Sequence, residues 1–257
     1  MLPEGFVFDD PISVSVAILT AIFVGLSKGG LGGAMAILGV AVMSLVIPPV
    51  QAAAILLPIL LVMDFIGLWA WWGNFDWRTI RLMLPGALVG VAVGWLTAAV
   101  VSDAAVRLIV GGIAMIYLAR WVWAARTGGR PATTHDPKLA AFWSLFAGYG
   151  SFVAHSGGPP YQIYTMPLKL PPVIFTGTST LFFTLVNVAK LPPYIALGQF
   201  DAANLITAAV LMPVAAVAVL AGVWIVKRMR MEVFYPFMHA MIFLVACKLL
   251  WDGARGL

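Results

Sequence analysis

The stretch Gly73-Asn74-Phe75-Asp76 decides how this chain is organised, because it recurs 125 residues later (198 minus 73) as Gly198-Gln199-Phe200-Asp201. In the same gapless register, Gly32-Gly33 matches Gly157-Gly158. Scattered glycine matches are expected by chance in this composition, but an ordered Gly-amide-Phe-Asp string that shares its register with a glycine pair is not. We therefore predict two halves that are related by an internal repeat.

Composition places this repeat in a membrane. The 257 residues are 62% hydrophobic and only 10% charged, whereas soluble domains carry about 45–50% apolar and about 25% charged residues. Because these few charged residues cannot cover a water-facing surface, lipid must solvate much of the exterior. The net charge of +5 does not indicate nucleic acid as a partner, because the basic residues lie in short connecting segments.

Apolar segments of roughly spanning length, about 20 residues, divide the chain. We predict ten of them, at 12–28, 31–47, 50–72, 79–100, 105–124, 138–155, 158–170, 172–197, 202–226 and 232–250. The second and seventh are short, so each forms either a tight spanning pair or a re-entrant hairpin with the segment before it. The predicted fold is an all-α polytopic membrane bundle of two inverted five-segment repeats, with broken or re-entrant helices at the start of each repeat.

A polar stretch separates the two halves. We predict an N-terminal transmembrane repeat over 1–125, a cytoplasmic linker over 126–138 and a C-terminal transmembrane repeat over 139–257. Five segments is an odd number, so the halves have opposite orientation, and both termini are expected in the periplasm. This topology places inside the cell Arg78, Arg81, Arg120, Arg126, Arg130, Lys138, Lys169, Lys227, Arg228 and Arg230, and outside it only Arg107, Lys248 and Arg255.

Lys28 lies inside a glycine-rich stretch that runs from Gly25 to Gly33. Each glycine costs a helix roughly 1 kcal/mol relative to alanine, so we expect the segment to be broken here. A break exposes backbone N–H groups and a positive helix N-terminus, and both attract anions. The alternative is a lysine that snorkels at a cytoplasmic helix end, with the glycines serving close packing.

A second break is expected at His155, which precedes Ser156-Gly157-Gly158-Pro159-Pro160. Proline suits the first turn of a helix, so a new half-helix is predicted to start at Pro159 or Pro160. His155 can donate to an anion or carry a proton. The alternative is a histidine that is hydrogen-bonded within the break for structural reasons.

Asp64 and Lys190 are ionisable residues within predicted spans, where charges are costly and are functional candidates. A buried lysine needs a partner. The nearest candidate partner of Lys190 by symmetry is Asp64, but Asn187, one turn before Lys190, could share the lysine. The pair either locks the repeats together or opens when substrate or a proton competes, and the sequence leaves both interpretations open. Gln51, Thr178 and Ser179 either line a path or bond to helix carbonyls, and His239 is expected to be structural.

Four of these motifs together resemble the sulfite exporter TauE/SafE family of membrane permeases. They are the Gly25–Gly33 string, His155–Pro160, the Gly177-Thr178-Ser179 element and Asn187–Tyr194. The resemblance covers almost the whole chain, and Ser156 stands where alanine is common in the resembling motif. It implies a bacterial inner-membrane transporter of small sulfur-containing or carboxylate anions, with sulfite, sulfoacetate and related organosulfonates as the usual substrates.

The residues and the resemblance agree on a secondary transporter that exports a small anion such as sulfite or an organosulfonate. The chain contains no Gly-x-x-x-x-Gly-Lys-Ser/Thr nucleotide loop, so energy must come from an ion gradient or from the membrane potential. That potential drives anion export by about 2.3 kcal/mol per charge per 100 mV. The two breaks would hold the anion near the midplane while one repeat rocks against the other.

The expected substrate-binding residues are Lys28, Gly29, Gly30, Gly32, Gly33, His155, Ser156, Gly157, Gly158, Thr178, Ser179, Asn187 and Lys190, and those for coupling or gating are Asp64, Lys190, His155 and Gln51. The expected partners are the anion, the lipid bilayer, protons as a coupling ion and a second copy in a homodimer. We expect no cofactor, no metal and no catalytic residue. The alternatives are an anion channel, an uptake permease for a small carboxylate or sulfur oxyanion and, less favoured, a membrane-embedded enzyme.

Overall fold

The computed structural model describes residues 7–8, 10–31, 42–43, 46–47, 49–97, 100–128, 132–154, 156–196 and 202–256. Several sequence predictions fall outside these ranges. They concern most of the segment 31–47 with Gly32 and Gly33, His155, and the repeated string at 198–201. The described residues contain helices and connecting turns, and no strand.

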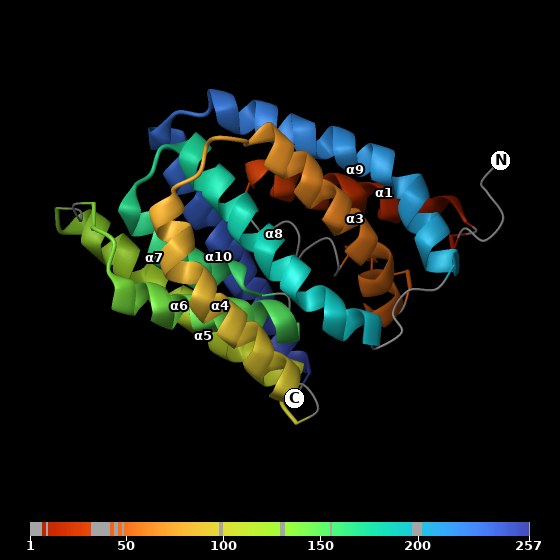
Figure 1. The fold of residues 1–257 in the computed structure, drawn as a ribbon, viewed down its shortest axis with the longest axis horizontal. Helices are drawn as coiled ribbons and strands as arrows, with labels where there is room; N and C mark the ends of the chain where they lie inside the picture. Colours follow the sequence, from red (N-terminus) through yellow and green to blue (C-terminus); the bar gives the residue numbers. More distant parts are fainter. Residues whose placement is uncertain are drawn as a thin grey trace. The chain divides into compact units, whose positions relative to one another are not determined.

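The helices follow the predicted apolar segments closely (Figure 1). They are α1 (Pro11–Leu26), η1 (Ser27–Leu31), α3 (Pro49–Ala70), α4 (Trp77–Thr97), α5 (Asp103–Arg126), α6 (Pro137–Ala154), α7 (Gly158–Thr165), η2 (Met166–Leu168), α8 (Pro172–Ala196), α9 (Ala202–Arg228) and α10 (Met231–Arg255). The all-helical class is therefore confirmed for the described part of the chain.

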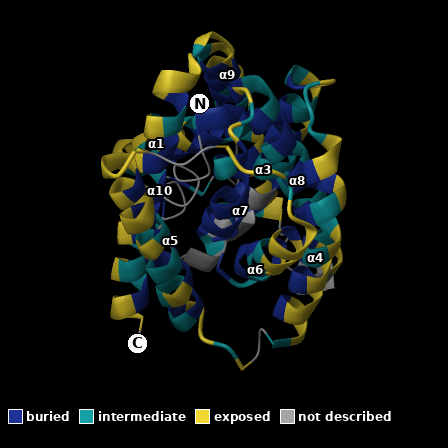
Figure 2. Ribbon diagram, turned by 90° about the vertical axis from the view of Figure 1, so that its left-hand side faces the viewer, coloured by how far each residue is buried: buried dark blue, intermediate teal, exposed yellow. Residues whose placement is uncertain are grey.

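Six helices in the described ranges are long and apolar enough to cross a membrane. These candidate spans are Pro11–Leu31, Trp77–Thr97, Asp103–Arg126, Pro172–Pro192, Ala202–Arg228 and Met231–Arg255. The 8 residues of α7 reach only about 12 Å at about 1.5 Å per residue, so α7 cannot cross a hydrocarbon core about 30 Å thick. It is nevertheless buried along its length (Figure 2), as the re-entrant interpretation requires.

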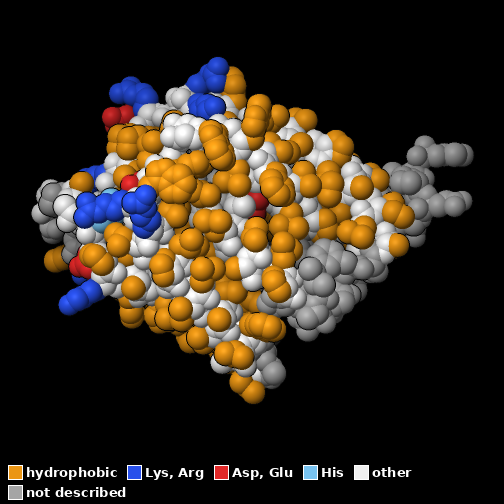
Figure 3. Space-filling view, viewed as in Figure 1, with side chains coloured by type: hydrophobic (Ala, Val, Ile, Leu, Met, Phe, Trp, Pro, Cys, Tyr) orange, Lys and Arg blue, Asp and Glu red, His pale blue; other side chains and the backbone are white. Residues whose placement is uncertain are grey.

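The described surface is what a lipid-exposed exterior requires. Large apolar side chains project outward, with exposures of 80% for Leu96, 68% for Val217 and 75% for Trp69. Hydrophobic side chains make up most of the face drawn in Figure 3. A water-exposed protein rarely shows apolar patches of this extent, so the multi-pass membrane assignment is supported by the fold as well as by composition.

The chain packs as two compact units. One unit comprises Met1–Gly73 with Leu191–Arg228, and the other comprises Asn74–Lys190 with Met229–Leu257. Each unit takes helices from both halves of the predicted repeat, since α9 packs with α1 and α3, and α6 packs with α4. The units therefore describe packing and do not test the sequence repeat.

Small residues allow the helices to approach one another within each unit. A Cβ atom added to Gly25 of α1 would lie 2.8 Å from the Ala215 carbonyl oxygen of α9. A Cβ atom on Gly90 of α4 would lie 2.7 Å from the Tyr149 nitrogen of α6. Both are too close for a side chain, so glycine is required at these crossings, as is typical of helix pairs in membranes.

Candidate functional site

The first predicted break lies at Lys28 and is confirmed. Helix α1 ends at Leu26, and Ser27–Leu31 form a π-helical turn. Gly30 within it has φ 125° and ψ 1°, a conformation that L side chains rarely adopt and that glycine allows. π-Turns inside helices are frequent at functional sites because they redirect side chains. The glycines therefore turn the chain at the lysine.

Lys28 forms an ion pair with Asp64 of α3. The Lys28 Nζ atom lies 2.5 Å from the Asp64 Oδ1 atom, and the two side chains are 16% and 2% exposed. A carboxylate this deeply buried requires a cation. The sequence analysis named Asp64 as the nearest candidate partner of Lys190, and neither interpretation of Lys28 predicted the pair with Asp64. The turn at Gly30 directs Lys28 toward α3, which a sequence offset cannot show.

Gly29 serves close packing, as the alternative interpretation predicted. A Cβ atom on Gly29 would lie 2.8 Å from the Gly222 Cα atom of α9. Its backbone is therefore held against α9, and a role in anion contact stays a prediction for Gly29 and Gly30. Gly32 and Gly33 lie outside the described residues.

The second break separates α6 from α7. Ser156 is fully buried, and its backbone N–H donates to the Gly150 carbonyl oxygen at 2.8 Å. Helix α7 begins at Gly158, with Gly157 before it and a proline in the first turn. The start predicted at Pro159 or Pro160 is late by one or two residues, because proline fits any early position of the first turn. His155 itself lies outside the described residues.

Lys190 of α8 reaches the end of α6, just before this break. Its Nζ atom donates to the Ser151 carbonyl oxygen at 3.1 Å and to the Ser151 hydroxyl at 3.0 Å. Lys190 is 3% exposed and Ser151 is 5% exposed. Sequence reasoning missed Ser151. The available signal was a hydroxyl in the apolar helix, six residues (157 minus 151) before a glycine pair.

Thr178 has a structural role. Its hydroxyl donates to the Ile174 carbonyl oxygen at 2.6 Å and accepts from the Asp76 backbone N–H at 2.8 Å. The alternative in which hydroxyls bond to helix carbonyls is therefore confirmed for Thr178. Ser179, Asn187 and Gln51 are partly exposed, and a substrate or gating role for them stays a prediction.

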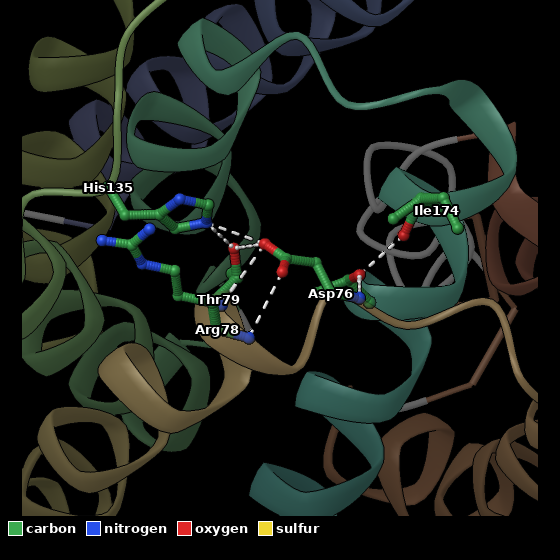
Figure 4. Close-up of polar contacts among 6 residues, drawn as sticks. Asp76, Arg78, Thr79, His135 and Ile174 are labelled. Atoms are coloured by element: carbon green, nitrogen blue, oxygen red, sulfur yellow. Dashed lines mark hydrogen bonds and ion pairs between the residues drawn. The ribbon is translucent and has the colours of Figure 1, made fainter.

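A polar cluster at the start of α4 was not predicted (Figure 4). Asp76 Oδ2 accepts from the Thr79 hydroxyl at 2.6 Å and from His135 Nε2 at 2.7 Å. A carboxylate only accepts hydrogen bonds, so His135 carries a proton on Nε2. Burial opposes ionisation of Asp76, but the bonds from Thr79 and His135 outweigh it and hold the pKa of Asp76 below its usual value. The repeated string marked Asp76, but nothing marked its partner in the linker.

These residues place positively charged side chains in an apolar environment. The partly buried Lys28 and the buried Lys190 each contact a helix break, and each ammonium group can donate three hydrogen bonds. Among the residues that the structure describes, no group of three or more histidine, cysteine or acidic side chains is placed to hold a metal ion. The arrangement suits the binding of an anion.

Comparisons with known proteins agree with this chemistry. The family described as "Sulfite exporter TauE/SafE" matches residues 17–249. A curated relative from Cupriavidus necator, "Probable sulfite/organosulfonate exporter TauE", is 28% identical over 151 residues, which are 58% of this chain and 58% of the relative. This match thus spans less than two thirds of the relative's length, and no solved structure matches the chain. Because the family match extends over most of the sequence, the chain belongs to the sulfite exporter TauE/SafE family of membrane transport proteins.

Proposed function

We propose that this protein is a secondary transporter that exports a small anion, sulfite or an organosulfonate, across the bacterial inner membrane. The observation that carries the proposal is a lysine at a helix break in each unit: Lys28, which is partly buried within η1, and Lys190 of α8, which is buried and contacts the end of α6. Buried charges in spans are costly and usually functional. The family match and the name of the Cupriavidus necator relative support the substrate class and the direction.

The Lys28–Asp64 pair offers a means of coupling. An oxyanion that approaches Lys28 competes with the Asp64 carboxylate for the ammonium group. Binding of the anion would therefore release the Asp64 carboxylate from Lys28, which links occupancy of this site to the opening of the ion pair. The pair is accordingly proposed as a gating element, which deepens the expectation that Asp64 takes part in coupling.

The helix boundaries support the predicted repeat. The starts of α1, α3, α4 and α5 precede those of α6, α8, α9 and α10 by 126, 123, 125 and 128 residues (137 minus 11, 172 minus 49, 202 minus 77 and 231 minus 103). The helix contacts are reciprocal as well, since α1 packs on α9 and α4 packs on α6. We propose on this basis two inverted repeats joined by a cytoplasmic linker, with both termini in the periplasm.

A binding screen tests the substrate class. Purified protein in detergent is heated with sulfite, thiosulfate, sulfoacetate, sulfate, short carboxylates and taurine. Taurine carries a sulfonate and an ammonium group, so it is the control for the requirement of a net negative charge. We expect saturable stabilisation by sulfite or sulfoacetate, and less by taurine. If only the carboxylates stabilised the protein, the proposed substrate class would be wrong.

Flux measurements then test the transport mode. Proteoliposomes loaded with the anion that binds should release it at a rate that saturates with concentration and increases when the compartment holding the anion is made electrically negative. Currents through single open pores would instead identify a channel. The same liposomes would reveal chemical conversion of the anion, which the proposal excludes.

A further inference from the structure

A cavity of about 430 Å³ lies within the second unit, and neither Lys28 nor Lys190 lines it. It is bounded by the end of α5, the linker, the start of α6, the α7–η2 segment and the start of α10. The cavity is much larger than the four atoms of a sulfite ion require, and no residue predicted for substrate binding lines it. A ligand of this cavity would therefore differ from the proposed transported anion.

The inner wall of this cavity is aromatic and rigid. The His239 ring stacks on Trp121, with 3.9 Å between ring centroids and an interplanar angle of 16°. His239 Nδ1 lies 2.7 Å from the Tyr235 carbonyl oxygen, which only accepts, so Nδ1 is the donor. The Tyr117 hydroxyl lies 3.3 Å from Nε2. His239 is thus structural, as predicted, and it presents a flat apolar surface to the cavity.

The rim of the cavity is positively charged. Arg120 and Lys169 both line it and both are exposed. Asp136 is the acidic residue among the described lining, and its Oδ1 atom accepts the Lys138 and Leu139 N–H groups at 2.8 and 3.1 Å. The Asp136 charge therefore compensates the N-terminus of α6. The lining therefore carries two cationic side chains beside one helix-capping carboxylate.

Lys169 is held at this rim in an uncommon backbone conformation. Its φ of 49° and ψ of 42° place it in the left-handed region, and among the described residues it is the non-glycine residue with positive φ. Glycine or asparagine usually ends a helix in this way. A lysine accepted here despite the strain indicates that the side chain serves a purpose at the rim.

An apolar wall under a cationic rim fits an amphipathic acid. We propose that this cavity binds one anionic glycerophospholipid from the bilayer, with its phosphate at Arg120 and Lys169 and its acyl chain along Trp121, Leu139 and Trp143. Leu139 is 51% exposed and Trp121 is 38% exposed, so a chain can enter from the lipid side. Basic pockets between transmembrane helices are known to receive acidic lipid headgroups.

Lipid titration of the delipidated full-length protein in neutral detergent, read by native mass spectrometry, tests the proposal. The probes are dioleoyl phosphatidylglycerol, dioleoyl phosphatidylcholine and glycerol 3-phosphate. We expect tight binding of one phosphatidylglycerol, weak binding of phosphatidylcholine and none of glycerol 3-phosphate. In the double variant R120Q/K169Q, phosphatidylglycerol should bind roughly thirtyfold more weakly, since each basic residue near the surface contributes about a fivefold gain.

The matched control is R81Q/K138Q, which also removes one arginine and one lysine, both exposed and neither lining the cavity. It should bind phosphatidylglycerol as the unchanged protein does. Equal binding of the two phospholipids, or equal losses in the two double variants, would overturn the proposal. Binding of glycerol 3-phosphate as tight as that of phosphatidylglycerol would overturn the lipid assignment. No transport is measured, so these outcomes are independent of the proposed export function.

Discussion

The contacts of Lys28 and Lys190 differ in charge, although the two lysines connect the same parts of the two halves. Lys28 reaches from the break after α1 to Asp64 of α3, and the contact joins opposite charges. Lys190 reaches from α8 back to the end of α6, and the oxygens of Ser151 that it contacts are neutral. In each half, a lysine connects the break after the first helix with the long third helix. Lys28 lies at the break and contacts the third helix, whereas Lys190 lies in the third helix and contacts a residue just before the break.

This difference explains why the sequence repeat could not locate the pairs. At an offset of 125, Lys28 aligns with Val153 (28 plus 125) and Asp64 aligns with Ala189 (64 plus 125). The repeat preserves the helices and the breaks, whereas the charges within it have been redistributed. Positions related by the repeat thus predict the backbone conformation well and the ion pairs poorly. Substitutions at the two lysines should show whether this division also holds for function.

The largest expected effect is on transport. Lys28→Ala and Lys190→Ala should each abolish anion flux in proteoliposomes, because each removes a buried positive charge that the proposed substrate requires. Lys248→Ala is the control, since Lys248 is partly exposed and pairs with Asp252 on its own helix. Unchanged flux in both lysine variants would contradict the site assignment, and loss in only one would show which of the two contacts serves transport.

The second largest expected effect is on the free energy of unfolding, and it separates the Lys28–Asp64 contact from the Lys190–Ser151 contact. Asp64→Asn leaves Lys28 buried beside a neutral group, and removing one partner of a buried ion pair costs about 3–5 kcal/mol. The double variant Lys28→Met/Asp64→Leu should recover most of this loss, because similar-sized apolar residues replace both charges. Denaturant unfolding in detergent measures both. A double variant as unstable as Asp64→Asn would show that the pair itself does not account for the cost.

Much of the backbone was predictable from residue type alone. Glycines predicted the turn at Gly30, prolines predicted the start of α7 to within two residues, and apolar length predicted α9 (Ala202–Arg228) from the segment 202–226. These features depend on local conformational preference, which the sequence carries directly.

Partners of side chains were less predictable. The Lys28–Asp64 pair depends on the direction in which a single π-turn points the lysine, and His135 contacts Asp76 across 59 positions of sequence. Ser151 was overlooked because a hydroxyl in an apolar helix normally bonds within its own helix. Such contacts follow from packing between helices, and no local pattern in the sequence records packing.

The Asp76 cluster provides a contrast outside the buried lysine sites. Because the pKa of Asp76 is lowered in the folded protein, its contribution to stability is present above the usual carboxyl pKa of about 3.9 and is lost as pH falls below it. Asp76→Asn should therefore cost about 2 kcal/mol near neutral pH, because a neutral amide accepts the bonds from Thr79 and His135 more weakly than a carboxylate does, and less near pH 3, where the carboxyl of the unfolded chain is protonated. Thermal unfolding at both pH values measures this. Glu232→Gln, in an exposed pair with Arg230, should change little at either pH.

The smallest expected effect is that of Ser151→Ala on the free energy of unfolding, and it tests the comparison of Lys28 with Lys190 most directly. Ser151→Ala removes one neutral acceptor from Lys190 and leaves the Ser151 carbonyl oxygen in place. A hydrogen bond to a charged group is worth about 1.5–3 kcal/mol, and the carbonyl oxygen that remains keeps the loss near the lower end of this range. Unfolding should therefore shift less than in Asp64→Asn, and flux should persist because the Lys190 charge remains. If Ser151→Ala were as damaging as Asp64→Asn, the serine hydroxyl would be as necessary to Lys190 as the carboxylate is to Lys28. The contacts of the two lysines would then contribute similarly to stability despite their different chemistry.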